Sequence, residues 1–232
     1  QMALEVNLVG INNGRYKVAV IQDDEYIGPC IARGYEWDGW MRPDIEKNYK
    51  PGTDIIDIGA NIGYNTLMFS DYGPVHSFEP VYYKIVDINV ENNTLKNNVF
   101  VYNCALSNEK ITSNIYLPNI KHSKNGMVNY GGTGLNFSET AIPMTVQCER
   151  LDDVYSGTPS IIKIDVEGHE LKTLEGAVET IKKHKPMLMV EIVNFTHDDP
   201  VHKYIKDLGY GEPEARPEWM FLYRANDIFS TM

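Results

Sequence analysis

Carboxylates follow four short apolar segments of this 232-residue chain, each at a point where a buried strand is expected to end. These residues are Asp57, Glu79, Asp165 with Glu167, and Glu191. A charged group beside a buried strand is expensive to desolvate unless it has a partner, and open α/β sheets bind ligands beyond the carboxyl ends of their strands. One such residue could be a structural cap. Four strands that end in this way predict a shared polar site.

The first of these carboxylates opens a turn that contains two glycines. Residues 54–58 are typical of a short buried strand, and Gly59 and Gly63 precede a segment with helical character. Because glycine has no Cβ, the backbone of such a turn can pass close to a small ligand. The spacing differs from the G-x-G-x-x-G fingerprint of dinucleotide-binding folds, and glycine turns without a cofactor also occur. The turn indicates a nucleotide-like cofactor without naming it.

Glu79 lies about twenty residues beyond Asp57, at the end of the next expected strand. A carboxylate at this place accepts the ribose hydroxyls in dinucleotide-binding folds. The alternative is a helix N-cap, which the directly following Pro80 disfavours. Cys104 and Ala105 end the third expected strand, where backbone groups could meet the edge of an adenine.

Strand and helix patterns alternate along most of the chain, with short connections between them. The expected strands are 54–58, 74–79, 99–105, 160–166 and 187–193, and the expected helices are 63–71, 82–96, 170–185 and 199–208. This alternation predicts an α/β, Rossmann-like fold: a mostly parallel central sheet with helices on both faces. A C-terminal antiparallel hairpin within 194–232 completes it. We find no linker or repeat, which predicts one domain over 1–232.

Three segments depart from the alternation. Residues 1–34 predict a small N-terminal β extension with a hairpin turn at 12–14. The aromatic and acidic segment 34–43 is either a cap on the core or a wall over a ligand. Residues 108–147 predict two strands, one on each side of a Gly/Asn-rich stretch. Long loops inside an α/β domain are commonly functional or disordered, and we expect an acceptor-side insertion with a lid.

The composition excludes several classes of partner. A net charge of −11 and a pI near 5.0 oppose binding to nucleic acid, which requires clustered Lys and Arg. The chain has no apolar run long enough to insert into a membrane.

Three widely spaced cysteines without a CxxC motif predict reduced thiols and a cytoplasmic location. The chain opens at Gln1, so we expect a domain that could be fused to others in a longer protein.

The stretch from Asp57 to Tyr64, Asp-Ile-Gly-Ala-Asn-Ile-Gly-Tyr, resembles the first motif of S-adenosylmethionine-dependent methyltransferases, in particular the FkbM family. Further matching motifs follow in that family's order: Phe78-Glu-Pro80, Asn89-Val-Glu-Asn92, Cys104-Ala-Leu-Ser107, Leu151-Asp-Asp153, Ile162-Lys-Ile-Asp-Val-Glu-Gly-His-Glu170 and the strand that ends at Glu191. The resemblance covers about 50–195, the expected cofactor-binding core. It implies a class I methyltransferase fold.

The resemblance also implies a role for each matching position. Asp57, Gly59, Asn61 and Gly63 would line the methionine and ribose parts of the cofactor, and Glu79, with Pro80 beside it, would hold the ribose hydroxyls. Cys104 and Ala105 would border the adenine, and Asp165 would lie near the sulfonium. Aromatic residues could add cation–π contacts to that cation. The candidates are Tyr64, Tyr35 and Trp37.

A hydroxyl acceptor needs a base within hydrogen-bond reach, because it is a poor nucleophile while protonated. The candidate catalytic residues are Asp165, Glu167, His169 and Glu191. For Glu167 the alternative is capping of the following helix, and for His169 it is an exposed side chain. By analogy with other sugar O-methyltransferases, Asp165, Glu191 and Asn194 could bind Mg²⁺ or Mn²⁺, which prefer oxygen ligands.

The sequence therefore predicts an O-methyltransferase that acts on a hydroxyl of a sugar or glycan-like acceptor. A methyltransferase for another small molecule or for a protein is an alternative. An NAD-type oxidoreductase could use Glu79 equally well, but the chain lacks the dinucleotide fingerprint and shows no Tyr-x-x-x-Lys pair. A non-catalytic nucleotide-binding domain is the remaining alternative.

Overall fold

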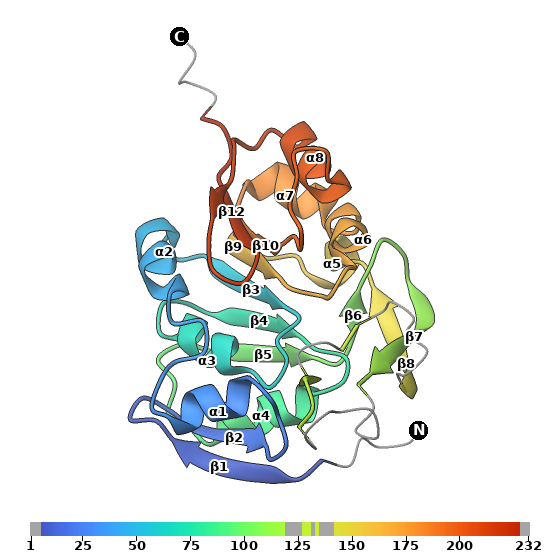
Figure 1. The fold of residues 1–232 in the computed structure, drawn as a ribbon. Helices are drawn as coiled ribbons and strands as arrows, with labels where there is room; N and C mark the ends of the chain where they lie inside the picture. Colours follow the sequence, from blue (N-terminus) through green and yellow to red (C-terminus); the bar gives the residue numbers. More distant parts are fainter. Residues whose placement is uncertain (1–5, 119–126, 131–132, 135–141, 228–232) are drawn as a thin grey trace.

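A central sheet organises the part of the chain that the computed structural model describes, which is residues 6–118, 127–130, 133–134 and 142–227. Within that part, seven strands form the sheet in the order β11-β12-β10-β9-β3-β4-β5 (Figure 1). Their bounds are β3 Asp54–Ile58, β4 Val75–Phe78, β5 Val99–Tyr102, β9 Pro159–Ile164, β10 Met187–Glu191, β11 Glu214–Ala215 and β12 Met220–Tyr223. Strands β5, β4, β3, β9 and β10 are parallel, and β12 pairs antiparallel with β10. The predicted fold class is confirmed.

The order of the strands changes direction at β3. From β3 the chain moves outward through β4 to β5, and it later returns to the other side of β3 with β9 and then β10. The carboxyl ends of β3 and β9 therefore meet at a topological switch point. Crevices at such points are where open α/β sheets bind ligands.

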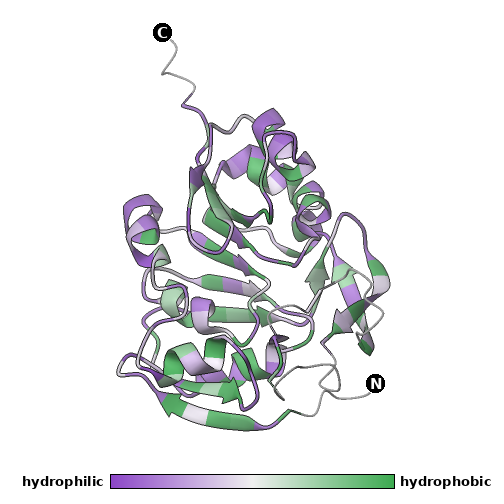
Figure 2. Ribbon diagram, in the orientation of Figure 1, coloured by the Kyte–Doolittle hydropathy of each residue, from purple (hydrophilic) through white to green (hydrophobic). Residues whose placement is uncertain are grey.

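Each face of the sheet is covered by its own layer, because side chains of a strand alternate between the two faces. Ile55 packs with α2 and α3, whereas its neighbours Ile56 and Ile58 pack with α6, α7 and α8. All three are fully buried or nearly so, as expected for parallel strands that are covered on both sides. Figure 2 shows the apolar central strands and the hydrophilic outer surfaces of α7 and α8. The bounds of these helices are α2 Met41–Asn48, α3 Tyr64–Ser70, α6 Glu170–Glu175, α7 Val178–His184 and α8 Pro200–Asp207.

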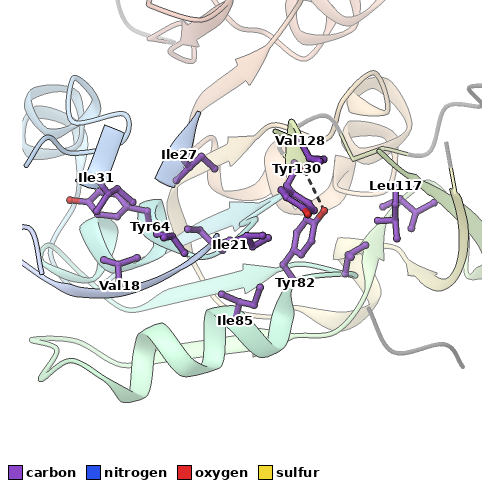
Figure 3. Close-up of a cluster of buried hydrophobic side chains, with 14 of the residues drawn as sticks. Val18, Ile21, Ile27, Ile31, Tyr64, Tyr82, Ile85, Leu117, Val128 and Tyr130 are labelled. Atoms are coloured by element: carbon purple, nitrogen blue, oxygen red, sulfur yellow. Dashed lines mark hydrogen bonds between the residues drawn. The ribbon is translucent and has the colours of Figure 1, made fainter. Parts of the chain in front are cut away.

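The N-terminal segment packs against α3 and α4 and extends the core (Figure 3). Its hairpin turns where predicted: Asn12 accepts a hydrogen bond from the backbone N–H of Gly14 at 2.9 Å. A short helix also lies in this segment, which the prediction of a purely β extension did not include. Figure 3 shows Ile27 and Ile31 of that helix beside Tyr64. The elements of this layer are β1 Leu8–Asn12, β2 Lys17–Ile21, α1 Ile27–Ala32 and α4 Tyr83–Glu91.

The region 108–147 forms a second, smaller sheet with the strands expected there. β7 and β8 pair antiparallel, and β6 pairs parallel with β8. Most of the Gly/Asn-rich stretch between β7 and β8 lies outside the described residues, so the predicted lid stays a prediction. Its described parts, 127–130 and 133–134, lie against the main domain, where Thr133 shares a hydrogen bond of 2.7 Å with the Tyr82 hydroxyl. The bounds are β6 Ala105–Leu106, β7 Ile111–Leu117 and β8 Ile142–Glu149.

Three predicted elements are shorter than expected. The helix predicted over 82–96 ends at Glu91, and the strand predicted over 99–105 breaks after Tyr102. The helix predicted over 170–185 is divided into α6 and α7. Gly176 lies at that break, where an added Cβ would come within 1.9 Å of the Ser107 carbonyl oxygen. This close approach between distant segments cannot be read from a local pattern. No helix in the described ranges is both long and apolar enough to cross a membrane.

Candidate functional site

A cavity of about 470 Å³ lies at the switch point of the sheet. Most of the residues that the sequence singled out line it: Gly59, Asn61, Tyr64, Glu79, Pro80, Cys104, Ala105, Asp165, Glu167 and Glu191. Asp57, Gly63, His169 and Asn194 do not belong to the lining. The strand ends therefore lie around one polar cavity, as expected. The four residues outside the lining lie in other surroundings, which are described below.

Asp57 stabilises the glycine turn through Lys163. Its side chain is fully buried and accepts hydrogen bonds from Lys163 Nζ at 3.0 Å and from the Thr66 hydroxyl at 2.7 Å. Lys163 also donates to the Gly59 carbonyl oxygen at 2.9 Å. Burial works to lower the pKa of Lys163, but the carboxylates of Asp57, Asp165 and Asp38 together outweigh burial, and the pKa is raised. Asp57 thus holds the charged lysine that fixes the turn, and it does not contact the cavity.

Lys163 is a functional residue to which the sequence reasoning assigned no role. The signal was present, because a lysine inside an otherwise apolar buried strand needs a charged partner. The strand β9 carries it at a position 2 % exposed, and the partner is on the neighbouring strand β3.

Gly59 and Gly63 are required by the shape of the turn. Gly59 has a φ of +83°, and a Cβ there would lie 1.9 Å from the carbonyl oxygen of Asp165. Gly63 has a φ of +94° and packs on Val86 of α4, which a Cβ would approach to 3.0 Å. Gly59 therefore lets β3 and β9 approach each other at the cavity, whereas Gly63 starts α3 behind it.

Glu79 joins the glycine turn to α4. One carboxylate oxygen accepts the backbone N–H of Asn61 at 2.9 Å, and the other accepts those of Val81 and Tyr82 at 2.8 and 3.0 Å. The side chain therefore caps the segment that leads into α4, despite Pro80, and it lines the cavity as well. A carboxylate has about four acceptor sites. Three are used, and the remaining one lies on the oxygen that faces the turn.

Three carboxylates converge on the other side of the cavity. Single oxygens of Asp165, Glu167 and Glu191 all lie within 4.8 Å of one another. Burial and then the negative charge of Asp165 raise the pKa of Glu191 to about 9 and that of Glu167 to about 7. Burial also raises the pKa of Asp165, to which Glu191 is hydrogen-bonded. Glu191 is therefore protonated at neutral pH, and the pKa of Glu167 lies near neutrality.

The turn that carries Glu167 is held by another carboxylate. Glu170 accepts hydrogen bonds from the backbone N–H groups of Val166 and Gly168 at 3.3 and 3.2 Å. Glu167 itself has a φ of +48°, an uncommon conformation that directs its side chain into the cavity. Glu170 thus stabilises the turn before α6, and no side chain of the described residues caps the start of that helix.

His169 and Asn194 lie outside the cavity. The His169 ring shares a hydrogen bond of 3.0 Å with the Ser107 hydroxyl, and burial lowers its pKa to about 4. The ring is half-buried, so the alternative of an exposed histidine does not hold either. Asn194 is exposed. Glu167 joins Asp165 and Glu191, two of the expected metal ligands, in one group of carboxylates.

Segment 34–43 forms part of the cavity wall, and it contributes a residue that the sequence reasoning missed. Asp38 lines the cavity and accepts hydrogen bonds from Asn65 Nδ2 at 3.1 Å and Trp40 Nε1 at 3.3 Å. Burial raises its pKa. Trp37 also lines the cavity, whereas Tyr35 is 66 % exposed and does not. The run of acids and aromatics identified the segment, but the φ of +54° that turns Asp38 inward has no local signature.

Acceptor atoms without partners gather in this cavity. Among the described residues, the cavity lining contains four buried side-chain oxygens without a hydrogen-bond partner: Asn61 Oδ1, Asn65 Oδ1, Asp165 Oδ1 and Glu191 Oε1. Buried polar atoms of native proteins are almost always satisfied. The described lining also carries the acids Asp38, Glu79, Asp165, Glu167, Glu191 and Glu218 against the base Lys163. The cavity therefore fits a ligand that is cationic and rich in hydrogen-bond donors.

The sequence matches the model of the Methyltransferase FkbM domain over residues 57–211. The chain belongs to the FkbM methyltransferase family. This is a family of S-adenosylmethionine-dependent methyltransferases, and the resemblance seen in the sequence is confirmed. A sulfonium, an ammonium and ribose hydroxyls are the groups that the acidic, acceptor-rich cavity fits. No match to a curated protein was found.

Several solved structures align with this chain. Trm5b from Pyrococcus abyssi aligns with a TM-score of 0.51 at 11 % identity, over 95 % of this chain and 56 % of its own. The FkbM methyltransferase from Methylobacillus flagellatus KT aligns at 19 % identity and a TM-score of 0.49, over 74 % of this chain. The tRNA (uracil-54, C5)-methyltransferase of P. abyssi, in complex with S-adenosyl-L-homocysteine, aligns at 11 % identity and a TM-score of 0.46, over 94 % of this chain. The alignments span 43 % of each of the latter two chains.

Proposed function

We propose that this chain transfers a methyl group to a hydroxyl of a sugar or other glycan-like acceptor, with Glu167 as the general base. The observation that carries the proposal is the group of Asp165, Glu167 and Glu191, whose pKa values are separated in one cavity. Two carboxyl groups with different environments can take different roles in acid–base chemistry. The acceptor class rests on the family resemblance.

Residues at the glycine turn would hold the cofactor. The free acceptor site of Glu79 suits a ribose hydroxyl, and the unpartnered oxygens of Asn61, Asn65 and Asp165 suit the donors of an ammonium group. Cys104 and Ala105 border the cavity at the end of β5, where the adenine is expected. Burial raises the pKa of Cys104 to about 12, so it is a neutral wall residue and not a nucleophile. When bound, S-adenosylmethionine supplies a methyl group on a positively charged sulfur.

Glu167 is the best placed of the candidate bases. A general base works best when its pKa is near the operating pH, which is where burial places Glu167. Glu191 is protonated at neutral pH, and Asp165 is hydrogen-bonded to it. His169 is turned toward Ser107. We therefore assign the removal of the hydroxyl proton to Glu167, while Asp165 and Glu191 position the acceptor and balance the positive charge of the donor.

The acceptor would enter between α1 and the β11–β12 turn. Tyr26 and Glu218 both line the cavity and are both exposed, so they mark its mouth. Glu218 has a φ of +58°, and such conformations are enriched at functional sites. A carboxylate and an aromatic ring at the mouth suit an acceptor with several hydroxyl groups and a face that can stack.

A metal-assisted reaction at the same carboxylates is a second candidate. Asp165, Glu167 and Glu191 offer the all-oxygen donor set that Mg²⁺ and Mn²⁺ prefer. A divalent cation among them would lower all three pKa values and would itself orient the acceptor. The assay described next separates the two candidates, because only the metal-assisted reaction is abolished by EDTA and restored by Mg²⁺ or Mn²⁺.

Isothermal titration with S-adenosylmethionine and S-adenosylhomocysteine tests the donor site. Labelled S-adenosylmethionine, incubated with the enzyme and a panel of saccharides, small-molecule alcohols and peptides, then tests the acceptor by mass spectrometry. We expect binding of both compounds and label on a saccharide hydroxyl. Label on a peptide or on a non-sugar alcohol would overturn the acceptor class, and failure of either compound to bind would overturn the donor site.

A further inference from the structure

A second group of possible ligands lies outside the cavity, at the start of α8. One donor atom each from His197, His202 and Glu212 lies within 4.8 Å of the others. His197 is on the loop that leaves β10, His202 is in the first turn of α8, and Glu212 precedes β11. Two imidazoles and a carboxylate are a ligand set that Zn²⁺ uses in proteins, with water in the fourth position.

The surroundings of His202 orient it as a ligand. The residue is 4 % exposed, and its Nδ1 shares a hydrogen bond of 2.8 Å with the Tyr223 hydroxyl of β12. The other ring nitrogen of His202, Nε2, is then the one that can bind a metal together with His197 and Glu212. A metal-binding histidine almost always has its other ring nitrogen held in this way. Asp199 caps α8 by accepting the backbone N–H of Val201 at 2.8 Å, which fixes the turn that carries His202.

An aromatic side chain holds both histidine rings in place. The Phe195 ring meets the edges of His197 and His202, with centroids 5.4 and 5.0 Å apart, and it stacks on Phe221 at 4.3 Å. The two histidine rings are themselves 5.2 Å apart. Two imidazoles packed this closely are compatible only when at least one is neutral, and a neutral imidazole is the form that binds metals.

The charges around the group also favour a cation. Glu212 lies 3.3 Å from His197 Nε2 through one carboxylate oxygen and 2.9 Å from Lys206 Nζ through the other. The oxygen near His197 could bind a metal while the other keeps the contact with Lys206. The acids Asp198 and Asp199 are close along the chain and partly offset the charges of Lys203 and Lys206.

We propose that His197, His202 and Glu212 bind one Zn²⁺ ion, which ties the β10–α8 loop to the segment before β11. Both of these segments continue into the cavity wall, where β10 carries Glu191 and the β11–β12 turn carries Glu218. The ion has a structural role: it holds these two segments together on the acceptor side of the cavity. The proposal is independent of the identity of the acceptor.

Titration of Zn²⁺ into EDTA-treated and desalted enzyme tests the site. We expect one ion per chain at this site and a rise in melting temperature with Zn²⁺, because a ligand that binds the folded state stabilises it. His197→Ala and Glu212→Ala remove ligands whose side chains are 75 % and 62 % exposed, so both variants should fold. Each should lose at least about tenfold in Zn²⁺ affinity, and Tyr223→Phe should lose about tenfold through the orientation of His202.

Two controls separate this site from others. His184→Ala removes a histidine from the end of α7 and should bind Zn²⁺ like the wild type. Glu167→Gln removes a carboxylate of the cavity group and should also keep the histidine-dependent binding. Absence of Zn²⁺ binding to the wild-type enzyme, or equal binding by the His197→Ala and Glu212→Ala variants, would overturn the proposal.

Discussion

The two sides of the cavity are built in different ways. At the glycine turn, the charged side chains are paired within the chain: Asp57 with Lys163 and Thr66, and Glu79 with three backbone N–H groups. Among the described residues, buried carboxylate oxygens lack partners on the side of Asp165 and Glu191, and so do the amide oxygens of Asn61 and Asn65 beside the glycine turn. The charged side chains of the first side are therefore preformed by contacts within the chain. The carboxylates of the second side keep acceptor atoms for what binds there.

This contrast extends to the backbone. The glycine side uses Gly59 and Gly63 for positive φ angles, with Asn61 between them at +54°, whereas the acidic side uses the three non-glycine residues Asp38, Glu167 and Glu218. Non-glycine residues in this conformation are held there by the surrounding structure at a cost of about 1–3 kcal/mol each. Stability is therefore concentrated at the donor site, and strain together with raised pKa values is concentrated where the acceptor is expected. The following predictions test this division.

The largest effect on stability is expected at the buried pair below the glycine turn. Asp57→Ala leaves the charge of Lys163 buried without its partner, which destabilises proteins by about 3–5 kcal/mol. Urea denaturation of the variant and of the wild type measures the difference. Asp153→Ala is the control, because this carboxylate is 54 % exposed in its pair with Arg150 and exposed pairs contribute less than about 1 kcal/mol. Equal losses in the two variants would contradict the preformed donor side.

A smaller effect is expected on donor affinity from Glu79. Glu79→Gln keeps the size of the side chain, but an amide can no longer accept from the backbone on both sides and also from a hydroxyl. Hydrogen bonds to charged groups contribute about 1.5–3 kcal/mol, so S-adenosylmethionine should bind about 10- to 100-fold more weakly. Isothermal titration measures this loss, with Glu179→Gln on the exposed face of α7 as the matched control. Unchanged affinity would remove Glu79 from the donor site.

The stability of the acidic side should depend on pH. The pKa of Glu191 rises from 4.5 to about 9 on folding, so the folded state holds its proton more tightly than the unfolded state. Stability is then fully present below 4.5 and falls as the pH rises toward 9. Glu191→Gln should remove this contribution, and the variant should gain stability relative to the wild type as the pH is raised. If the melting temperatures of the wild type and of Glu191→Gln changed in parallel with pH, the raised pKa of Glu191 would be contradicted.

The smallest effect is expected from Trp37 and Tyr35, two of the three aromatic residues considered as cation–π partners. Trp37 lines the cavity, but Tyr35 is 66 % exposed and lies outside the lining. Trp37→Ala should weaken S-adenosylmethionine binding by a few fold, as expected for a contact of about 0.5–1 kcal/mol. Tyr35→Ala should leave it unchanged, and an equal loss in both variants would show that segment 34–43 acts through its fold alone.

Sequence reasoning located the carboxylates at the strand ends better than the contacts between distant segments, for a physical reason. The turn after β3, the carboxylate after β4 and the acids after β9 and β10 follow from local patterns and from the rule that parallel strands end at one edge. The break at Gly176, the inward turn of Asp38 and the pairing of His169 with Ser107 depend on contacts between distant segments. A local pattern cannot contain such contacts. The hydrogen bonds of Glu170 to the turn that carries Glu167 also depend on the folded shape of that turn.

Methyl transfer by Glu167→Gln tests the central claim most directly. The change keeps the shape of the side chain and removes its ability to accept a proton. Labelled S-adenosylmethionine and the acceptor found with the wild type are the reagents, and the donor affinity is measured in parallel. We predict a fall in kcat of about 10²- to 10⁴-fold with S-adenosylmethionine bound as tightly as before. A kcat within a few fold of the wild type would contradict the assignment of Glu167 as the base.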